Sequence, residues 1–259
     1  MKPPVPPFLF AILLFSGMLL MLEIGRRLAI RRRPRESEGE RGSLSTIEGA
    51  VFALFGLVVA FTFSGAASRF NEKRGLIAEE ANYVETAYLR LHLLSETAQP
   101  EMKDLFRHYL DSRLETYRRL PDMQAAELEI ANSRKIQREI WSKATSATTL
   151  RDSHVDAGKL LLPAINNMID ISTTRIMALQ NHPPAVIYLL LFVLGLICSL
   201  LAGYRMAVGQ NRSWLHILSF ALITVIVIYV IIDVEYPRAG LIRLGGFDQV
   251  LVDVRSHMD

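Results

Sequence analysis

Small and hydroxyl-bearing residues recur along one side of the second apolar segment of the sequence. The positions are Gly49, Ala53, Gly56, Ala60, Ser64 and Ala67, followed by Ser68. At 100° per residue, as in an α-helix, the first six fall within an arc of about 80°, away from the bulky Phe52 and Phe55. Such a side would leave room for water and line an ion path. Alternatively, it would let helix backbones approach closely in lipid, and the frequency of small-xxx-small patterns in non-conducting bundles favours this packing role.

The third apolar segment also carries a row of small residues along one side. Gly195, Ser199 and Gly203 follow one another at four-residue steps. We therefore expect the second span to pack closely on the third, or on its own copy in another subunit.

Charged residues gather where the second and fourth apolar segments end. Arg69 follows one segment, Asp233 and Glu235 close the other, and Arg238 comes just after. These ends share one membrane face, and a carboxylate at the edge of the hydrocarbon needs a partner or an aqueous cavity. The four residues therefore predict either a pore mouth or a structural clamp, and we favour the clamp.

The acidic run AEEANYVETAY offers oxygen ligands from Glu79, Glu80, Asn82 and Glu85. It lacks the glycine turn of a calcium loop, so we interpret it as a solvated helix face. The sequence also contains no HExxH zinc motif, phosphate loop, dinucleotide fingerprint or nucleophile elbow. We therefore expect that the protein is not an enzyme and that it binds neither a metal ion nor a cofactor.

The elements that must position these residues are membrane spans. Hydrophobic residues make up 51% of the 259 residues and charged ones 21%. Segments 8–24, 47–68, 185–208 and 214–234 reach the length of about 20 apolar residues that a bilayer requires. The basic cluster GRRLAIRRRPR suits lipid headgroups better than nucleic acid.

Between the second and third spans, apolar residues recur at helical spacing, which predicts an all-helical module. Its first helix continues the second span to about residue 94, with a coiled-coil-like seam of Ile77, Ala81, Val84, Tyr88 and Leu91. The predicted fold is an all-α membrane protein with four transmembrane helices in two pairs and this extramembrane module inserted between helices two and three. The predicted parts are 1–25 (first transmembrane helix), 26–46 (Arg-rich loop), 47–69 (second transmembrane helix), 70–183 (helical module), 184–208 (third transmembrane helix), 209–234 (short loop and fourth transmembrane helix) and 235–259 (amphipathic C-terminal segment).

The orientation of the spans is open. The Arg-rich loop favours a cytoplasmic position for residues 26–46 and hence an external module. Basic residues at the opposite ends of the spans, including Lys73 and Arg74, favour the reverse.

The strings GAASRF, EEAN, TAYLRL, PAINNMIDI, AGYRMA, SWLH and DVEYPRAGLIR, in this order and spacing, resemble the bestrophin-like domain family of bacterial membrane proteins. The resemblance covers nearly the whole chain and implies two pairs of spans around a helical insert. Its remote link to bestrophins, which are oligomeric anion channels with cytoplasmic termini, implies a channel with a cytoplasmic module. The chain lacks a counterpart of the calcium-binding acidic cluster of bestrophins, which argues against calcium gating.

Together these observations predict a multi-pass protein of the inner membrane that forms a homo-oligomeric ion channel or conduit. Its expected partners are the lipid bilayer, further copies of itself and inorganic ions, and no nucleic acid. The alternative is a non-conducting membrane scaffold or sensor that binds a partner through the helical module.

Overall fold

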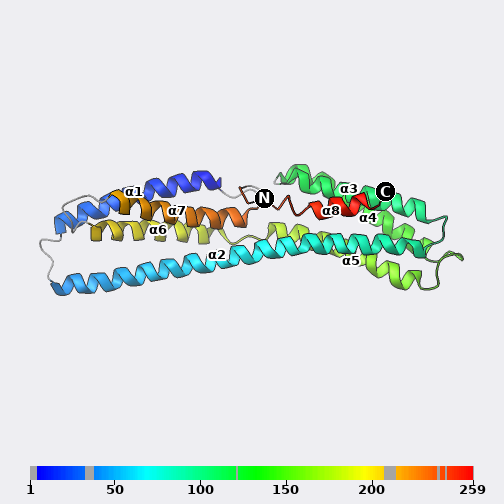
Figure 1. The fold of residues 1–259 in the computed structure, drawn as a ribbon, viewed down its shortest axis with the longest axis horizontal. Helices are drawn as coiled ribbons and strands as arrows, with labels where there is room; N and C mark the ends of the chain where they lie inside the picture. Colours follow the sequence, from blue (N-terminus) through cyan, green and yellow to red (C-terminus); the bar gives the residue numbers. More distant parts are fainter. Residues whose placement is uncertain are drawn as a thin grey trace. The chain divides into compact units, whose positions relative to one another are not determined.

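The computed structural model describes residues 5–32, 38–120, 122–206, 214–237, 240–242 and 244–258, without the side chains of residues 38–41 and 123. Within these residues the chain is helical and contains no strand, which confirms the all-α prediction (Figure 1). The elements are α1 (Pro7–Arg32), α2 (Glu38–Leu89), the 3-10 helix η2 (Arg90–Leu93), α3 (Gln99–Arg119), α4 (Met123–Ala147), α5 (Ala157–Gln180), α6 (Ala185–Met206), α7 (Trp214–Glu235) and α8 (Gln249–Ser256). Four helical stretches are long and apolar enough to cross a membrane, as predicted.

The chain divides into two compact units. The first, here called the span unit, holds α1, the first part of α2, α6 and α7, within residues 5–68 and 182–236. The second, here called the helical unit, holds the rest of α2, α3, α4, α5 and α8, within residues 69–181 and 237–258.

Helices α1 and α2 are longer than the apolar segments from which they were predicted. Most of the stretch expected as an Arg-rich loop is helical, because α1 ends at Arg32 and α2 begins at Glu38. Arginine is a good helix former. In addition, Glu23 accepts hydrogen bonds from Arg26 at 3.1 Å and Arg27 at 2.8 Å, one turn along the helix. Arg33 and Arg35 lie outside the described residues.

In the span unit, α1 and α6 approach each other with almost no side chain between them. A Cβ atom added at Gly25 would lie 2.0 Å from the carbonyl oxygen of Leu200, and one added at Gly203 would lie 2.0 Å from that of Leu22. Only glycine permits this distance. The glycines of the third span therefore pack against α1, and not against the small side of α2. The sequence did not point to Gly25, because it stands beside Arg26 at the end of the apolar run.

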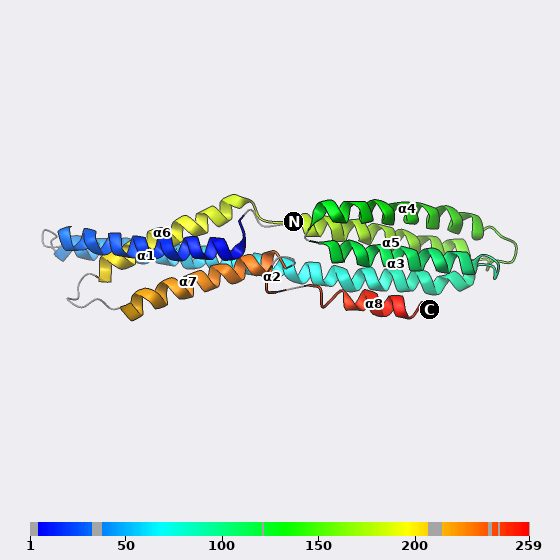
Figure 2. The same cartoon turned by 90° about the horizontal axis from the view of Figure 1, so that it is seen from above.

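The helical unit is a bundle whose helices run alongside one another (Figure 2). The predicted seam of α2 is in its core: Ile77, Ala81, Val84 and Leu91 are buried, and Tyr88 is half-buried. The caps of the bundle helices follow local sequence. Pro100 occupies the first turn of α3, and the Asp122 carboxylate accepts a hydrogen bond from the backbone N–H of Gln124 at 3.1 Å to start α4.

The C-terminal segment completes this bundle. Leu251 and Val254 of α8 are buried in its core. The backbone carbonyl of Met258 accepts hydrogen bonds from the Tyr88 hydroxyl at 2.9 Å and from Nε of Arg107 at 2.8 Å. Residues 251–258 are therefore fixed by both apolar burial and polar contacts.

Candidate functional site: the exposed side of α2 and a buried ion-pair network

The small side of α2 is turned away from the rest of the span unit. Gly49, Ala53, Gly56, Ala60, Ser64 and Ser68 are exposed, and Ala67 is half-buried. A Cβ atom added at Gly49 or Gly56 would meet nothing within 4 Å. Within the residues that the structure describes, this side of α2 is therefore largely uncovered.

The bulky side of α2 makes the contacts with the span unit. Phe55 is 9% exposed, and its ring lies 4.0 Å from where a Cβ atom of Gly195 would stand. Phe52 packs edge-on against Phe220 of α7, with 6.2 Å between the ring centroids. Because these contacts hold one side of α2, the side with the small residues is left largely exposed in the described part of the chain.

The hydroxyl of Ser199 does not face such an open surface. It is buried and donates a hydrogen bond to the backbone carbonyl of Gly195 at 2.8 Å. The small residues of α6 therefore serve packing within the chain. Those of α2 are exposed and could meet another copy or solvent.

One of the charged residues predicted at the span ends, Glu235, has a partner that the sequence did not indicate. Glu235 is buried, and its carboxylate lies 3.1 Å from Nδ1 of His182. The His182 ring also stacks on Tyr236, with 4.3 Å between the ring centroids. Asp233 is buried as well, and Arg69 is half-buried. Arg238 lies outside the described residues. The choice between pore mouth and clamp stays a prediction.

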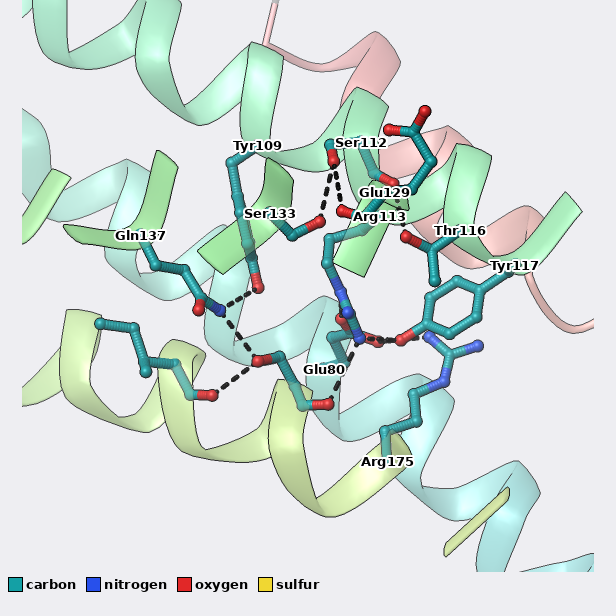
Figure 3. Close-up of polar contacts among 12 residues, drawn as sticks. Glu80, Tyr109, Ser112, Arg113, Thr116, Tyr117, Glu129, Ser133, Gln137 and Arg175 are labelled. Atoms are coloured by element: carbon teal, nitrogen blue, oxygen red, sulfur yellow. Dashed lines mark hydrogen bonds and ion pairs between the residues drawn. The ribbon is translucent and has the colours of Figure 1, made fainter. Parts of the chain in front are cut away.

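A buried ion-pair network lies in the helical unit, centred on Glu80 of α2 (Figure 3). Its Oε1 accepts a hydrogen bond from Nε of Arg113 on α3 at 2.6 Å. Its Oε2 accepts one from the Tyr117 hydroxyl at 2.8 Å and another from Arg175 on α5. Arg175 continues to the Asp248 carboxylate at 2.5 Å. The network therefore joins α2, α3, α5 and the C-terminal segment.

The two arginines set the charge of Glu80. Burial by itself would raise the pKa of this carboxyl group, but attraction to Arg113 and Arg175 outweighs burial and lowers the pKa from 4.5 to about 2. Burial also raises the pKa of Tyr117, which keeps its hydroxyl protonated as a donor. The guanidinium carbon of Arg175 lies 3.5 Å from the centroid of the Tyr117 ring, which adds a cation–π contact. Near neutral pH the network therefore holds a fixed charge distribution.

Uncharged polar groups of α3, α4 and α5 form further buried hydrogen bonds beside the network (Figure 3). The side-chain amide of Gln137 donates hydrogen bonds to the Tyr109 hydroxyl at 3.3 Å and to the Ser172 hydroxyl at 2.8 Å. The hydroxyls of Ser112 and Ser133 lie 2.8 Å apart. These bonds satisfy buried polar groups of α3, α4 and α5, so they fix the helices in one register.

The interpretation of the acidic run as a wholly solvated face was wrong for Glu80. Glu79, Asn82 and Glu85 are exposed, but Glu80 is 0% exposed. Among the described residues, no group of three or more His, Cys, Asp or Glu side chains could hold a metal ion. A signal for Glu80 existed in the sequence, because it lies three residues after Ile77 and four before Val84, inside the apolar seam.

The sequence was compared with models of known protein families. The sequence model of the Bestrophin-like domain matches residues 25–245. The chain belongs to the Bestrophin-like domain family. The match covers all of the described helices except the first part of α1 and helix α8, so it includes both α2 and the Glu80 network of this bestrophin-like protein.

A solved structure supports the fold of the bestrophin-like chain. A variant of a bacterial bestrophin homologue from Klebsiella pneumoniae superposes with a TM-score of 0.59. The two sequences are 17% identical, and the match covers 96% of this chain and 97% of the homologue. At this identity the similarity concerns the fold. No curated protein matches the sequence.

Proposed function

We propose that this bestrophin-like protein is an oligomeric ion conduit of the inner membrane, in which the exposed small side of α2 lines the conducting path. The observation that carries the proposal is the placement of Gly56, Ala60 and Ser64. They belong to a membrane-length helix, yet all three are exposed in the described span unit, and a Cβ atom added at Gly56 would meet nothing within 4 Å. Membership of the Bestrophin-like domain family supports a channel-like function.

The proposed path uses the lack of side-chain volume on α2. Copies arranged around an axis, each with this side facing inward, would enclose a passage in which backbone and hydroxyl groups meet the ion. The bulky Phe55 on the opposite side anchors α2 to its own chain and keeps the small side inward.

The experiment that tests this proposal adds bulk to the small side. The full-length protein is reconstituted in liposomes, and ion flux is measured for the wild type, for Ala60→Trp and for Leu54→Trp. Leu54 is 52% exposed on α2 and lies about 120° around the helix from Ala60, so it is the matched control. We expect Ala60→Trp to abolish flux while the oligomer persists, and Leu54→Trp to keep it.

Two results would contradict the conduit. If the wild-type protein assembles but passes no ions under varied pH, calcium and voltage, the alternative of a non-conducting membrane scaffold is favoured. An Ala60→Trp variant that loses its oligomeric state would instead assign the small side to helix packing between copies.

A further inference from the structure

Helix α4 presents two arginines to the surface of the helical unit without matching carboxylates. Arg134 and Arg138 are exposed and stand one turn apart. Among the described residues, neither forms an ion pair or a hydrogen bond. Like charges four residues apart destabilise an isolated helix slightly, so an anion that binds beside both arginines would relieve this repulsion.

The two arginines border a hollow in the surface. Arg134, Arg138 and Trp141 of α4, with Gln137, face Ile169 of α5 around a volume of about 350 Å³. The Trp141 side chain, at 39% exposure, is partly open to it. Exposed tryptophan and arginine beside a hollow are the residue types enriched where proteins bind each other. The basic surface is defined here as Arg134, Arg138 and Trp141.

The helical unit also presents uncompensated carboxylates on another side. Glu72 and Glu79 are exposed on α2, seven residues and therefore two turns apart on the same side of the helix. Among the described residues, neither pairs with a cation, and Glu79 accepts only the Tyr83 hydroxyl at 3.0 Å. The acidic surface is defined here as Glu72 and Glu79.

The two surfaces lie apart within the unit. In Figure 2, α4 runs along one side of the helical unit, and α2 lies toward the other side with α5 and α3 between them. The basic and acidic surfaces therefore cannot neutralise each other within one chain. A heterologous contact, in which different surfaces of identical copies meet, would pair both surfaces. Such a contact generates a ring when the rotation from copy to copy closes.

We propose that the basic surface of one copy docks on the acidic surface of a second copy of this chain. This inference rests on the proposed oligomer and names the contact that orders it. The guanidinium groups of Arg134 and Arg138 would pair with the carboxylates of Glu72 and Glu79, and α2 of the second copy would cover the hollow beside Trp141. The contact repeats around the ring because each copy carries both surfaces.

Charge reversal tests this contact in the full-length protein. Sedimentation in detergent micelles measures assembly of three variants, namely R134E/R138E, E72R/E79R and the combination of all four substitutions. We expect each double variant to raise the dissociation constant of the oligomer by about tenfold or more, because like charges then face each other. The fourfold variant should recover wild-type assembly, because it exchanges the two signs.

Two control variants each reverse one charge elsewhere on the helical unit. Glu85→Arg alters an exposed carboxylate on α2 about 120° around the helix from Glu79. Arg151→Glu alters an exposed arginine in the turn after α4. Both should assemble like the wild type. Circular dichroism of every variant must show the wild-type helix content, because all the altered side chains are exposed.

The outcomes separate the inference from the proposed function. If the wild-type protein is monomeric, the proposed function as an oligomeric conduit is contradicted. A wild-type oligomer that the double variants leave unchanged, or that the fourfold variant fails to recover, would overturn only the proposed contact. Binding of inorganic phosphate that is lost in R134E/R138E, with assembly unchanged, would also overturn it and assign the basic surface to a small anion.

Discussion

The helical unit and the span unit hold their helices together by opposite means. In the helical unit, Glu80, Arg113 and Arg175 are at most 2% exposed, and their charges bind three helices to one another. In the span unit, α1 and α6 meet backbone to backbone at Gly25 and Gly203.

With the span unit in lipid and the helical unit in water, as we propose, the solvent of each unit explains the difference. A bundle in water gains stability by burying apolar surface, and it tolerates charges in the core when every charge is paired. Helices in lipid gain little from apolar burial, so close backbone contact supplies dispersion energy instead. The ion pair of Glu23 with Arg26 accordingly lies where the apolar segment of α1 ends, and His182 contacts Glu235 at the end of α7.

Removing the centre of the network should have the largest effect. Glu80→Ala leaves Arg113 and Arg175 buried without their shared carboxylate, and we expect a loss of about 3–5 kcal/mol in unfolding free energy. Denaturant titration of the full-length protein in micelles, followed by circular dichroism, measures it. The exposed neighbour gives the matched control, because Glu79→Ala should change stability by less than about 0.5 kcal/mol. Equal effects of the two variants would contradict the buried network.

Acid should weaken the same unit without any mutation. The pKa of Glu80 is lowered from 4.5 to about 2 by its arginines, so the folded state favours the ionised form. The stability that this carboxylate contributes is therefore present above pH 4.5 and is lost as the pH falls toward about 2. Unfolding free energies measured across this range should fall more steeply for the wild type than for Glu80→Gln. Parallel curves would show that Glu80 is not the titrating group.

A side chain at the glycine crossing should break the other unit. Gly203→Val places a Cβ atom against the carbonyl of Leu22, which cannot move without separating the helices, and we expect a loss of about 1–3 kcal/mol or more. Thermal unfolding in micelles measures the change. Gly75→Ala is the control, because a Cβ atom there meets nothing within 4 Å. It should be neutral or stabilise the helix by up to about 1 kcal/mol.

Loosening the C-terminal segment should have the smallest effect. Asp248→Asn removes one carboxylate from Arg175 but leaves its contact with Glu80, so we expect a loss of about 1 kcal/mol. Amide hydrogen exchange should rise in residues 249–258 and stay unchanged in α3. Asp253→Asn, at an exposed position of α8, should leave the exchange of both regions as in the wild type. Uniformly faster exchange would show that Asp248 supports the whole bundle.

Hydropathy and periodicity were sufficient to predict the helical class, the four apolar helices and the buried seam of α2. Each of these depends on local spacing, which the sequence displays directly: Ile77, Val84 and Leu91 recur at seven-residue steps and all are buried. The start of α2 at Glu38 was missed, because a charged stretch carries no apolar period to mark it.

The sequence by itself determined which side of α2 is small and which is bulky, since that follows from 100° per residue. Only the tertiary structure decided which side of α2 faces the rest of the span unit. That orientation depends on the contacts of Phe55 with Gly195 and of Phe52 with Phe220. The same holds for Glu80, whose partners lie 33 and 95 residues away along the chain. Charges this distant in sequence form a network only when three helices pack together. Local sequence patterns do not predict that packing.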